Sequence, residues 1–208
     1  MNVKNVVKHI NEQREKDIKS VNIRVEDVIQ LNEVIEITKH KELETLLILS
    51  KLFMIKVKLI GDTPQPKIIE KGDWIDLYVR EDTIVPDKYT MVKIPLGVAM
   101  ELPKGYEALI VPRSSTPIKH SIMLANSIGV IDNSYNGNTD EWSFLAKNIT
   151  LNSVCVPKGA RIAQFRIQLS QKANLWQKIQ WLFSSKIEFE YVDILTNQSR
   201  GGYGTTGI

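Results

Sequence analysis

The chain has 208 residues, of which 43% are hydrophobic and 25% are charged, a composition typical of globular proteins rather than disordered ones. Its 27 basic and 24 acidic side chains leave a formal net charge of +3, too balanced for a protein that coats nucleic acid. The single cysteine excludes an intrachain disulfide, and no stretch holds the roughly 18 apolar residues of a membrane span. We therefore expect a cytoplasmic protein that binds neither membranes nor nucleic acid directly, with Cys155 buried between two valines.

Residues 1–53 differ in composition from the rest, because they contain neither proline nor glycine. Apolar residues recur there at the i, i+3, i+4, i+7 spacing of a helical face, as in Val3, Val6, Val7 and Ile10. A short segment at 21–25 alternates instead and would be extended. We predict a helical N-terminal extension over residues 1–53.

Residues 54–208 show a strand pattern. Ile55, Val57 and Leu59 alternate with lysines, which indicates a half-buried strand. Short apolar runs then recur between turn residues, at 75–79, 91–94, 108–111, 128–131 and 162–167. All eight prolines and all eleven glycines lie in this part of the chain. Many short strands with closely spaced turns predict a mainly β fold, an antiparallel barrel or sandwich.

Two segments depart from that strand pattern. A helical stripe predicts an inserted helix over about 171–184, whose aromatic face packs on the barrel or on a neighbour; its members are Leu175, Trp176, Ile179, Leu182 and Phe183. The tail, residues 197–208, contains four glycines and cannot supply much core. Such a tail is either disordered or ordered by a ligand.

Several kinds of chemistry can be set aside. The three histidines, His9, His40 and His120, are scattered without the spacing of metal ligands, so a zinc site of His and Cys is not expected. The sequence contains no Gly-x-Ser-x-Gly nucleophile elbow and no Walker A loop. Polar turns next to the predicted strands are the remaining candidates.

Three such turns carry candidate residues. The segment 112–115, Pro-Arg-Ser-Ser, follows an apolar strand and would form either a phosphate cradle or an ordinary polar turn. The segment 129–137 is expected to be a hairpin in which Asp132 is either a general base or a turn-capping residue. Gln164 follows Ile162 by two residues, so both side chains are expected on the inward face, where the amide of Gln164 needs a partner.

In this order the clusters resemble the five motifs of the homotrimeric, all-β dUTP pyrophosphatase (dUTPase) family, particularly its Gram-positive bacterial and phage members. The matching segments are Asp73–Leu77, Pro112–Ser115, Asn126–Gly137, Gly159–Gln164 and Arg200–Gly207. The resemblance covers residues 54–208, including the stretch 95–103. It implies a jelly-roll-like β-barrel that hydrolyses dUTP to dUMP and pyrophosphate, with residues 197–208 as a lid.

The resemblance also assigns the nucleoside half of the site. Asp132 would be the general base for the water that attacks the α-phosphate. Tyr135 would pack on the deoxyribose and leave no room for a 2′-hydroxyl. The side chain of Asn126 and the backbone of Gly129, Val130 and Ile131 would bind uracil and reject cytosine.

The phosphate half follows from the remaining motifs. The resemblance implies phosphate contacts from Arg113, Ser114, Ser115 and Gln164. The lid would add Arg200, Tyr203, Gly204 and Thr205. Asp76 would hold Mg²⁺, the expected cofactor, through its water shell.

In the family, three subunits of a homotrimer build each site, and the reaction keeps uracil out of DNA and supplies dUMP for dTMP synthesis. Phage members can also act on a regulatory protein partner. The resemblance thus leaves open a second role as a dUTP-gated regulatory binder. A dCTP deaminase of the same fold superfamily is the other alternative.

Two motifs depart from the family pattern. Asp73 and Trp74 stand where the first motif usually has Ala-Gly. Tyr203 takes the place of a Phe that stacks on uracil, with Arg200 closer to it than usual. Tyr203, Trp142 and Phe144 are therefore the three candidates for covering the base.

Overall fold

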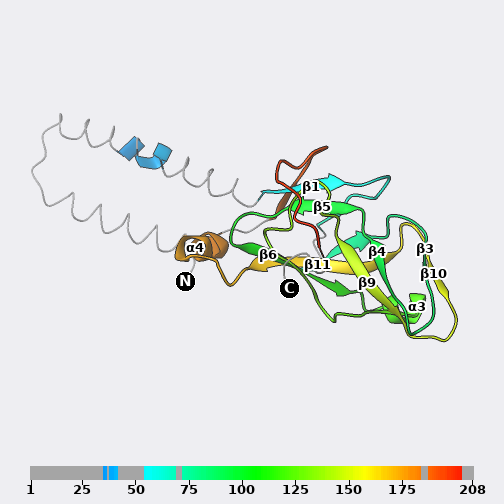
Figure 1. The fold of residues 1–208 in the computed structure, drawn as a ribbon. Coiled ribbons are helices and arrows are strands. Elements are labelled where there is room, and N and C mark those ends of the chain that lie inside the picture. The colour runs from blue at the N-terminus through cyan, green and yellow to red at the C-terminus, as the bar shows by residue number, and fades with distance from the viewer. Residues whose placement is uncertain (1–34, 37, 42–53, 69–71, 184–186, 203–208) are drawn as a thin grey trace, which may run out of the picture. The chain divides into compact units, whose positions relative to one another are not determined.

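The computed structural model describes residues 35–36, 38–41, 54–68, 72–183 and 187–202 (Figure 1). The chain divides into two compact units, 1–48 and 49–208, close to the boundary predicted after residue 53. In the first unit, residues 35–36 and 38–41 are helical. The rest of the predicted extension lies outside the described residues. Within the described ranges, no helix is both long enough and apolar enough to cross a membrane.

The second unit is built from short strands, as predicted. The first six are β1 (Met54–Leu59), β2 (Ile75–Tyr78), β3 (Thr83–Val85), β4 (Met91–Pro95), β5 (Val98–Glu101) and β6 (Tyr106–Pro112). The others are β7 (Ile122–Leu124), β8 (Gly129–Ile131), β9 (Ser143–Asn148), β10 (Val154–Val156), β11 (Arg161–Leu169) and β12 (Glu188–Tyr191). Two helices interrupt them, α3 (Thr116–His120) and α4 (Leu175–Phe183).

These strands form small sheets that share one core. Their orders are β12-β1-β5, β10-β3, β2-β11-β6-β8 and β4-β9-β7. The pairings are antiparallel except that of β1 with β12, which is parallel. Strand β11 runs through the middle of the fold between β2 and β6 (Figure 1). The mainly β prediction is therefore confirmed.

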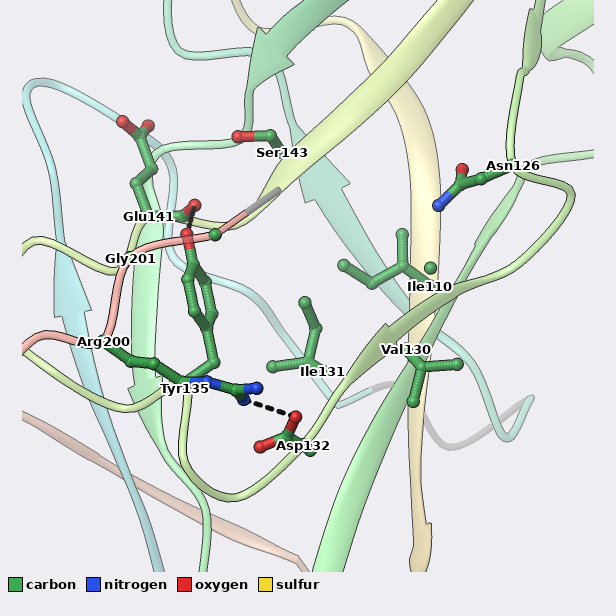
Figure 2. A pocket seen from close by; sticks show the side chains of 12 residues that line it. Ile110, Asn126, Val130, Ile131, Asp132, Tyr135, Glu141, Ser143, Arg200 and Gly201 are labelled. Carbon is green, nitrogen blue, oxygen red and sulfur yellow. Dashed lines mark hydrogen bonds and ion pairs between the residues drawn. The ribbon is translucent and has the colours of Figure 1, made fainter. Parts of the chain in front are cut away.

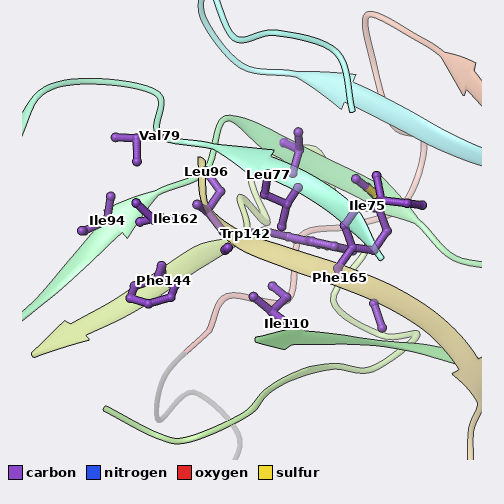
Figure 3. Close-up of a cluster of buried hydrophobic side chains, with 14 of the residues drawn as sticks. Ile75, Leu77, Val79, Ile94, Leu96, Ile110, Trp142, Phe144, Ile162 and Phe165 are labelled. Atoms are coloured by element: carbon purple, nitrogen blue, oxygen red, sulfur yellow. The ribbon is translucent and has the colours of Figure 1, made fainter. Parts of the chain in front are cut away.

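The core is filled by the inward residues of several strands, with few polar atoms (Figure 3). Ile55 and Val57 of β1 point inward, as their alternation predicted. Trp142 and Phe165 meet edge to face, with ring centroids 5.2 Å apart, a favourable aromatic geometry. Trp142 and Phe144 are both 0% exposed. Neither can cover uracil, so that part of the prediction is wrong.

A β-bulge reverses the predicted orientation of Gln164. The pairing of β11 with β2 shifts register between Arg161 and Ala163, and Ile162 and Ala163 are both buried. Alternation resumes out of phase, with Phe165 inside and Gln164 outside. The prediction that Gln164 shares the inward face with Ile162 is therefore wrong, because one extra residue in a strand changes the face of everything beyond it.

Strand pairing also contradicts two further predictions, the burial of Cys155 and the hairpin at 129–137. Cys155 is exposed, not buried, because β10 pairs only with β3 and turns its central residue outward opposite Ile84. The segment 129–137 is not a hairpin: β8 pairs with β6, and Gly137 instead forms a parallel bridge with Asn197. The chain thus leaves the sheet after Ile131 and meets the tail.

The inserted helix is shorter than predicted and only partly packed. Trp181 of α4 lies against Tyr106, with ring centroids 5.6 Å apart. The hydroxyl of Tyr106 donates a hydrogen bond to the carbonyl of Gln177 at 3.2 Å. By contrast, Leu175, Trp176 and Leu182 are 74%, 58% and 78% exposed. Part of the predicted aromatic face therefore packs on the barrel, and part faces outward.

Candidate active site

A pocket of about 230 Å³ opens beside β8 (Figure 2). It is lined by Ile110, Asn126, Gly129, Val130, Ile131, Asp132, Tyr135, Glu141, Ser143, Arg200, Gly201 and Gly202. The structure therefore brings the predicted nucleoside residues and Arg200 together in one chain. Asn126 lies across the pocket from Tyr135 and Arg200. The predicted lid residues Tyr203, Gly204 and Thr205 lie outside the described residues.

The turn after β8 fixes the position of Asp132. The N–H of Tyr135 donates to the carbonyl of Asp132 at 3.0 Å, and the N–H of Ser134 donates to its Oδ1 at 2.8 Å. The amide of Asn133 is anchored on the carbonyl of Pro103 at 3.0 Å. The side chain of Asp132 is thereby capped like a turn residue yet remains 52% exposed on the pocket wall. The geometry of Asp132 is thus compatible with both interpretations of the sequence, a turn-capping residue and a general base.

The electrostatics of Asp132 favour its charged form. Burial raises the pKa of this carboxyl, but hydrogen bonds from Ser134 and Arg200 and the charge of Arg200 outweigh it, so the pKa lies below its ordinary value. Nη1 of Arg200 is 2.5 Å from Oδ2 of Asp132. The lowered pKa favours the carboxylate form of Asp132, which accepts hydrogen bonds.

The ring of Tyr135 stands as a wall of the pocket. Its hydroxyl donates a hydrogen bond to the carbonyl of Glu141 at 2.9 Å, as Figure 2 shows. The carboxylate of Glu141 in turn accepts from Nε of Arg80 and from the N–H of Gly97, both at 2.9 Å. A β-carbon placed on Gly202 would lie 3.2 Å from the ring. The ring is therefore held at its tip and covered by the tail.

A tight turn presents Asn126 to the pocket. Ser127 has φ 63°, a left-handed conformation that is uncommon for a residue other than glycine. The N–H of Ile128 donates to the carbonyl of Asn126 at 2.6 Å. This turn directs the chain into β8, whose backbone follows directly along the pocket. Asn126 and β8 can therefore offer an amide side chain and backbone groups to one planar ligand.

The predicted phosphate residues lie together elsewhere on the same chain. With the predicted metal residue Asp76 and with Arg161, to which the sequence assigned no role, they form a set that we call the cradle cluster: Asp76, Arg113, Ser114, Ser115, Arg161 and Gln164. Asp76 pairs across the ladder with Gln164. The N–H of Arg113 donates to the carbonyl of Ile162 at 3.1 Å, which places the 112–115 turn beside the bulge. None of the cradle cluster lines the pocket.

The carboxylate of Asp76 is already engaged by two guanidinium groups. Its Oδ1 is 2.8 Å from Nε of Arg113, and its Oδ2 is 3.1 Å from Nη1 of Arg161. Among the residues that the structure describes, no group of three His, Cys, Asp or Glu side chains is placed to hold a metal ion. The donors in the described part of the chain therefore form no resident metal site, and the metal role of Asp76 stays a prediction.

Sequence reasoning missed several residues at the pocket. Glu141 and Ser143 line it, and Asp140 anchors the backbone of Arg200 and Gly201. Asp140 and Glu141 lie in a polar stretch, Asn-Thr-Asp-Glu, that has no periodicity. The one available signal was that two acidic residues directly precede the buried Trp142.

Comparisons with known proteins show which family the chain belongs to. The dUTPase family model matches residues 66–180. An SPbeta prophage-derived deoxyuridine 5'-triphosphate nucleotidohydrolase from Bacillus subtilis (strain 168) is 44% identical over 156 residues, which cover 74% of this chain and 97% of that protein. The chain belongs to the dUTPase family. A deoxyuridine 5'-triphosphate nucleotidohydrolase from Hydrogenobaculum sp. (strain Y04AAS1) is 34% identical, covering 73% of this chain and 95% of that protein.

Solved dUTPase structures share the fold. The dUTPase from Streptococcus mutans aligns with a TM-score of 0.52 and 28% identity, covering 57% of this chain and 98% of that one. The dUTPase of Staphylococcus bacteriophage 80alpha aligns with a TM-score of 0.50 and 22% identity, covering 58% of this chain and 93% of that one. The chain is thus a dUTPase, an enzyme that hydrolyses dUTP, and this decides against the dCTP deaminase alternative.

Proposed function

We propose that the chain cleaves dUTP to dUMP and pyrophosphate, with Asp132 as the general base. The single observation that carries this proposal is the ionised carboxylate of Asp132 on the wall of a pocket that also holds Asn126 and Tyr135. A water between Asp132 and the α-phosphorus would lose its proton to the carboxylate as it attacks. The bond to the pyrophosphate oxygen then breaks, and pyrophosphate leaves with its electron pair.

The proposed selectivity follows from the pocket walls. Uracil would lie between Asn126 and β8, where an amide and backbone groups match its carbonyl and imide groups. Cytosine would present a donor where uracil presents an acceptor, so polar groups would remain unpaired. Tyr135, fixed by its hydrogen bond to Glu141, would pack on the deoxyribose and clash with a 2′-hydroxyl. UTP and dCTP should therefore be poor substrates.

The proposed phosphate site needs a second chain. The cradle cluster offers two guanidinium groups, two hydroxyls and an amide beside the carboxylate of Asp76, yet it does not line the pocket. A homotrimer with shared sites brings the cradle of one subunit to the pocket of another. Exposed apolar residues fit such contacts: Met91 and Met123 are 56% and 48% exposed, and both pair with Lys147 on one sheet.

The proposed metal ion enters with the substrate. Because the chain's described donors do not form a metal site, Mg²⁺ would be held by the triphosphate itself, whose charge it neutralises. A phi11 phage dUTPase is described with a structural Mg(II) ion.

The remaining lid residues, Tyr203, Gly204 and Thr205, would close over the phosphates. We propose the cytoplasm as the location, where the reaction limits uracil in DNA and provides dUMP.

A pyrophosphate-release assay with dUTP, dCTP and UTP tests the proposal. We expect turnover of dUTP that rises with the concentration of the Mg²⁺ complex, and little turnover of the two controls. Equal rates with UTP would contradict the role of Tyr135. Ammonia release from dCTP would contradict the reaction itself.

A second candidate function is regulation through another protein. The observation that favours it is the exposed face of α4, formed by Leu175, Trp176 and Leu182, since exposed apolar patches often mark interaction sites. One related phage enzyme, from 80alpha, is described as controlling transfer of virulence genes. Replacing Trp176 and Leu182 by serine should leave dUTP turnover unchanged and abolish any dUTP-dependent complex; a complex that survives both changes would exclude this face.

A further inference from the structure

The turn that carries Asp132 is fastened to the rest of the fold by the next side chain, Asn133. The hydrogen bond from the N–H of Ser134 to Oδ1 of Asp132 lies within the turn, so it fixes the shape of the turn but not its place. The amide of Asn133 reaches outside the turn and donates to the carbonyls of Leu102 and Pro103. The position of Asp132 therefore depends on the segment that carries those two carbonyls.

Strand pairing brings that segment, the 102–105 loop, beside the turn. The loop leads into β6, and the last residue pair of the β6–β8 ladder joins Ala108 to Ile131. Because the two strands are antiparallel, the chain before Ala108 runs beside the chain after Ile131, which begins with Asp132. Leu102 at the start of the loop is 2% exposed, so this end of the loop is held in the core.

The other end of the 102–105 loop is held by helix α4. Nε2 of Gln177 donates a hydrogen bond to the carbonyl of Lys104 at 2.8 Å. Gly105 has φ 88°, which favours glycine, and a β-carbon there would lie 2.4 Å from Cδ of Gln177. The amide of Gln177 therefore lies directly against the backbone of the loop.

The same amide also caps helix α4. Oε1 of Gln177 accepts from the N–H of Asn174 at 2.8 Å, and Oδ1 of Asn174 accepts from the N–H of Gln177 at 2.9 Å, the reciprocal pattern of a capping box. The two ends of one amide thus have different partners: the oxygen holds the helix and the nitrogen holds the loop. The substitution Gln177→Glu keeps an acceptor for the helix, but a carboxylate has no hydrogen to donate to Lys104.

We propose that Asn133 and Gln177 are positioning residues for the dUTPase reaction, because the 102–105 loop transmits the support of α4 to the turn that holds Asp132. Neither side chain lines the pocket, so both act through the placement of Asp132 and not on the nucleotide. The family resemblance assigned no role to either residue. The rate depends steeply on the alignment of base, water and phosphorus. The inference rests on the general-base role of Asp132 in the proposed function and adds the residues that fix its position.

The substitution Gln177→Glu tests the nitrogen of this amide alone. We expect kcat for pyrophosphate release from dUTP to fall about 3–10-fold, because one hydrogen bond that holds the loop is lost. The affinity and stoichiometry of a non-hydrolysable dUTP analogue, measured by calorimetry, should remain at the wild-type values, which shows that the loss of rate is not a loss of folded sites. An unchanged kcat, or a kcat that falls only in proportion to the number of binding sites, would overturn the inference.

Asn174→Asp is the matched control. It makes the same change of an amide to a carboxylate in the same cap, but Oδ1 of Asn174 acts as an acceptor, which a carboxylate oxygen replaces. We expect a kcat within about twofold of wild type. A loss equal to that of Gln177→Glu would mean that negative charge or helix stability, rather than the bond to Lys104, lowers the rate, and the inference would be wrong.

A double-mutant cycle tests the connection between the two residues. Asn133→Ala alone should lower kcat about 10–100-fold, since the turn loses its tie to the loop. Adding Gln177→Glu should then lower kcat by less than about twofold more, because the path is already interrupted. Multiplication of the two separate losses would show that the residues act independently, which contradicts the inference.

The outcome for Asp132→Asn, measured beside these variants, separates the inference from the proposed function. If Asp132→Asn keeps a rate within about tenfold of wild type, the proposed function fails and the inference fails with it. If Asp132→Asn loses its rate while Gln177→Glu matches Asn174→Asp, only the inference fails. Loss of rate in Asp132→Asn and Gln177→Glu, but not in Asn174→Asp, is the result that we expect.

Discussion

The pocket and the cradle cluster are built in different ways from the same chain. In the pocket, backbone groups anchor both key side chains, Asp132 through the N–H of Ser134 and Tyr135 through the carbonyl of Glu141, and Asp132 also forms an ion pair with Arg200. In the cradle, charged side chains hold one another, with Arg113 and Arg161 sharing Asp76. In the proposed function, the backbone anchors would preorganise the nucleoside site, whereas exchangeable ion pairs would yield to a triphosphate. We therefore propose that the fold of one chain determines nucleoside selectivity and that phosphate binding needs the proposed trimer.

The largest expected effect is the fall in kcat when Asp132 in the pocket is replaced. Asp132→Asn keeps the shape of the side chain but cannot accept a proton, so kcat should fall about 10²–10⁴-fold. Steady-state pyrophosphate release measures it, and binding of a non-hydrolysable dUTP analogue by calorimetry provides the control, which should remain near wild type. A rate within tenfold of wild type would remove Asp132 as the base.

Arg113→Ala tests the cradle side. Loss of a charge-assisted hydrogen bond of roughly 1.5–3 kcal/mol should lower kcat/KM for dUTP about 10–100-fold. Affinity for deoxyuridine, which has no phosphate, should not change, because Arg113 does not line the pocket. Lys158→Ala, which removes an exposed ion pair with Asp62, is the matched control. An equal loss for deoxyuridine would mean that the two regions are not separable.

The Arg200–Asp132 pair links the tail to the base and predicts a pH effect. Because the folded pKa of Asp132 is lowered, its interactions stabilise the fold above the ordinary Asp pKa and are lost as pH falls through the folded value. Arg200→Gln removes the charge, so the pKa of Asp132 should rise towards its ordinary value. Carboxyl-carbon NMR titration measures this directly, with Arg161→Gln as the control. An unchanged pKa would show that Ser134 alone sets it.

The smallest expected effect comes from removing the hydroxyl of Tyr135, whose ring forms a wall of the pocket. Tyr135→Phe removes the hydrogen bond to Glu141, which should lower the free energy of unfolding by about 0.5–1.5 kcal/mol. The ring itself remains, so discrimination against UTP should decrease only slightly. Urea denaturation and the dUTP to UTP ratio of kcat/KM measure the two effects. A loss of discrimination as large as that of Tyr135→Ala would assign the selectivity to the hydroxyl rather than the ring.

Local patterns predicted most of the strands and the family resemblance named most of the pocket residues, but neither indicated the contacts between distant segments. Alternation in β1 and the runs that became β4, β6 and β11 are properties of neighbouring residues, so the sequence alone indicated them. The docking of Arg200 on Asp140 joins residues 60 positions apart, and no periodicity records it. The same holds for Glu141, whose carboxylate binds the N–H of Gly97, 44 positions away.

The second group of wrong predictions concerns which side chains face the core and which face outward. The exposed Cys155 reflects the two-stranded pairing of β10, which short-range hydrophobicity cannot show. Trp142 and Phe144 were named by residue type as alternatives to Tyr203 for covering uracil, but both side chains are buried in the core. Gln164 was assigned to the wrong face because periodicity assumes an unbroken ladder.

The bulge that displaces Gln164 has a consequence for how this enzyme tolerates insertions and deletions. Ile162 and Ala163 are both buried, so the alternation of inward and outward side chains shifts by one residue at this point. Phe165 therefore points into the core and Gln164 points outward. Deleting a single residue there would restore a regular ladder but exchange those two side chains, placing an amide in the core and an aromatic ring among the cradle charges. The number of residues at the bulge in β11 is therefore as constrained as their identity.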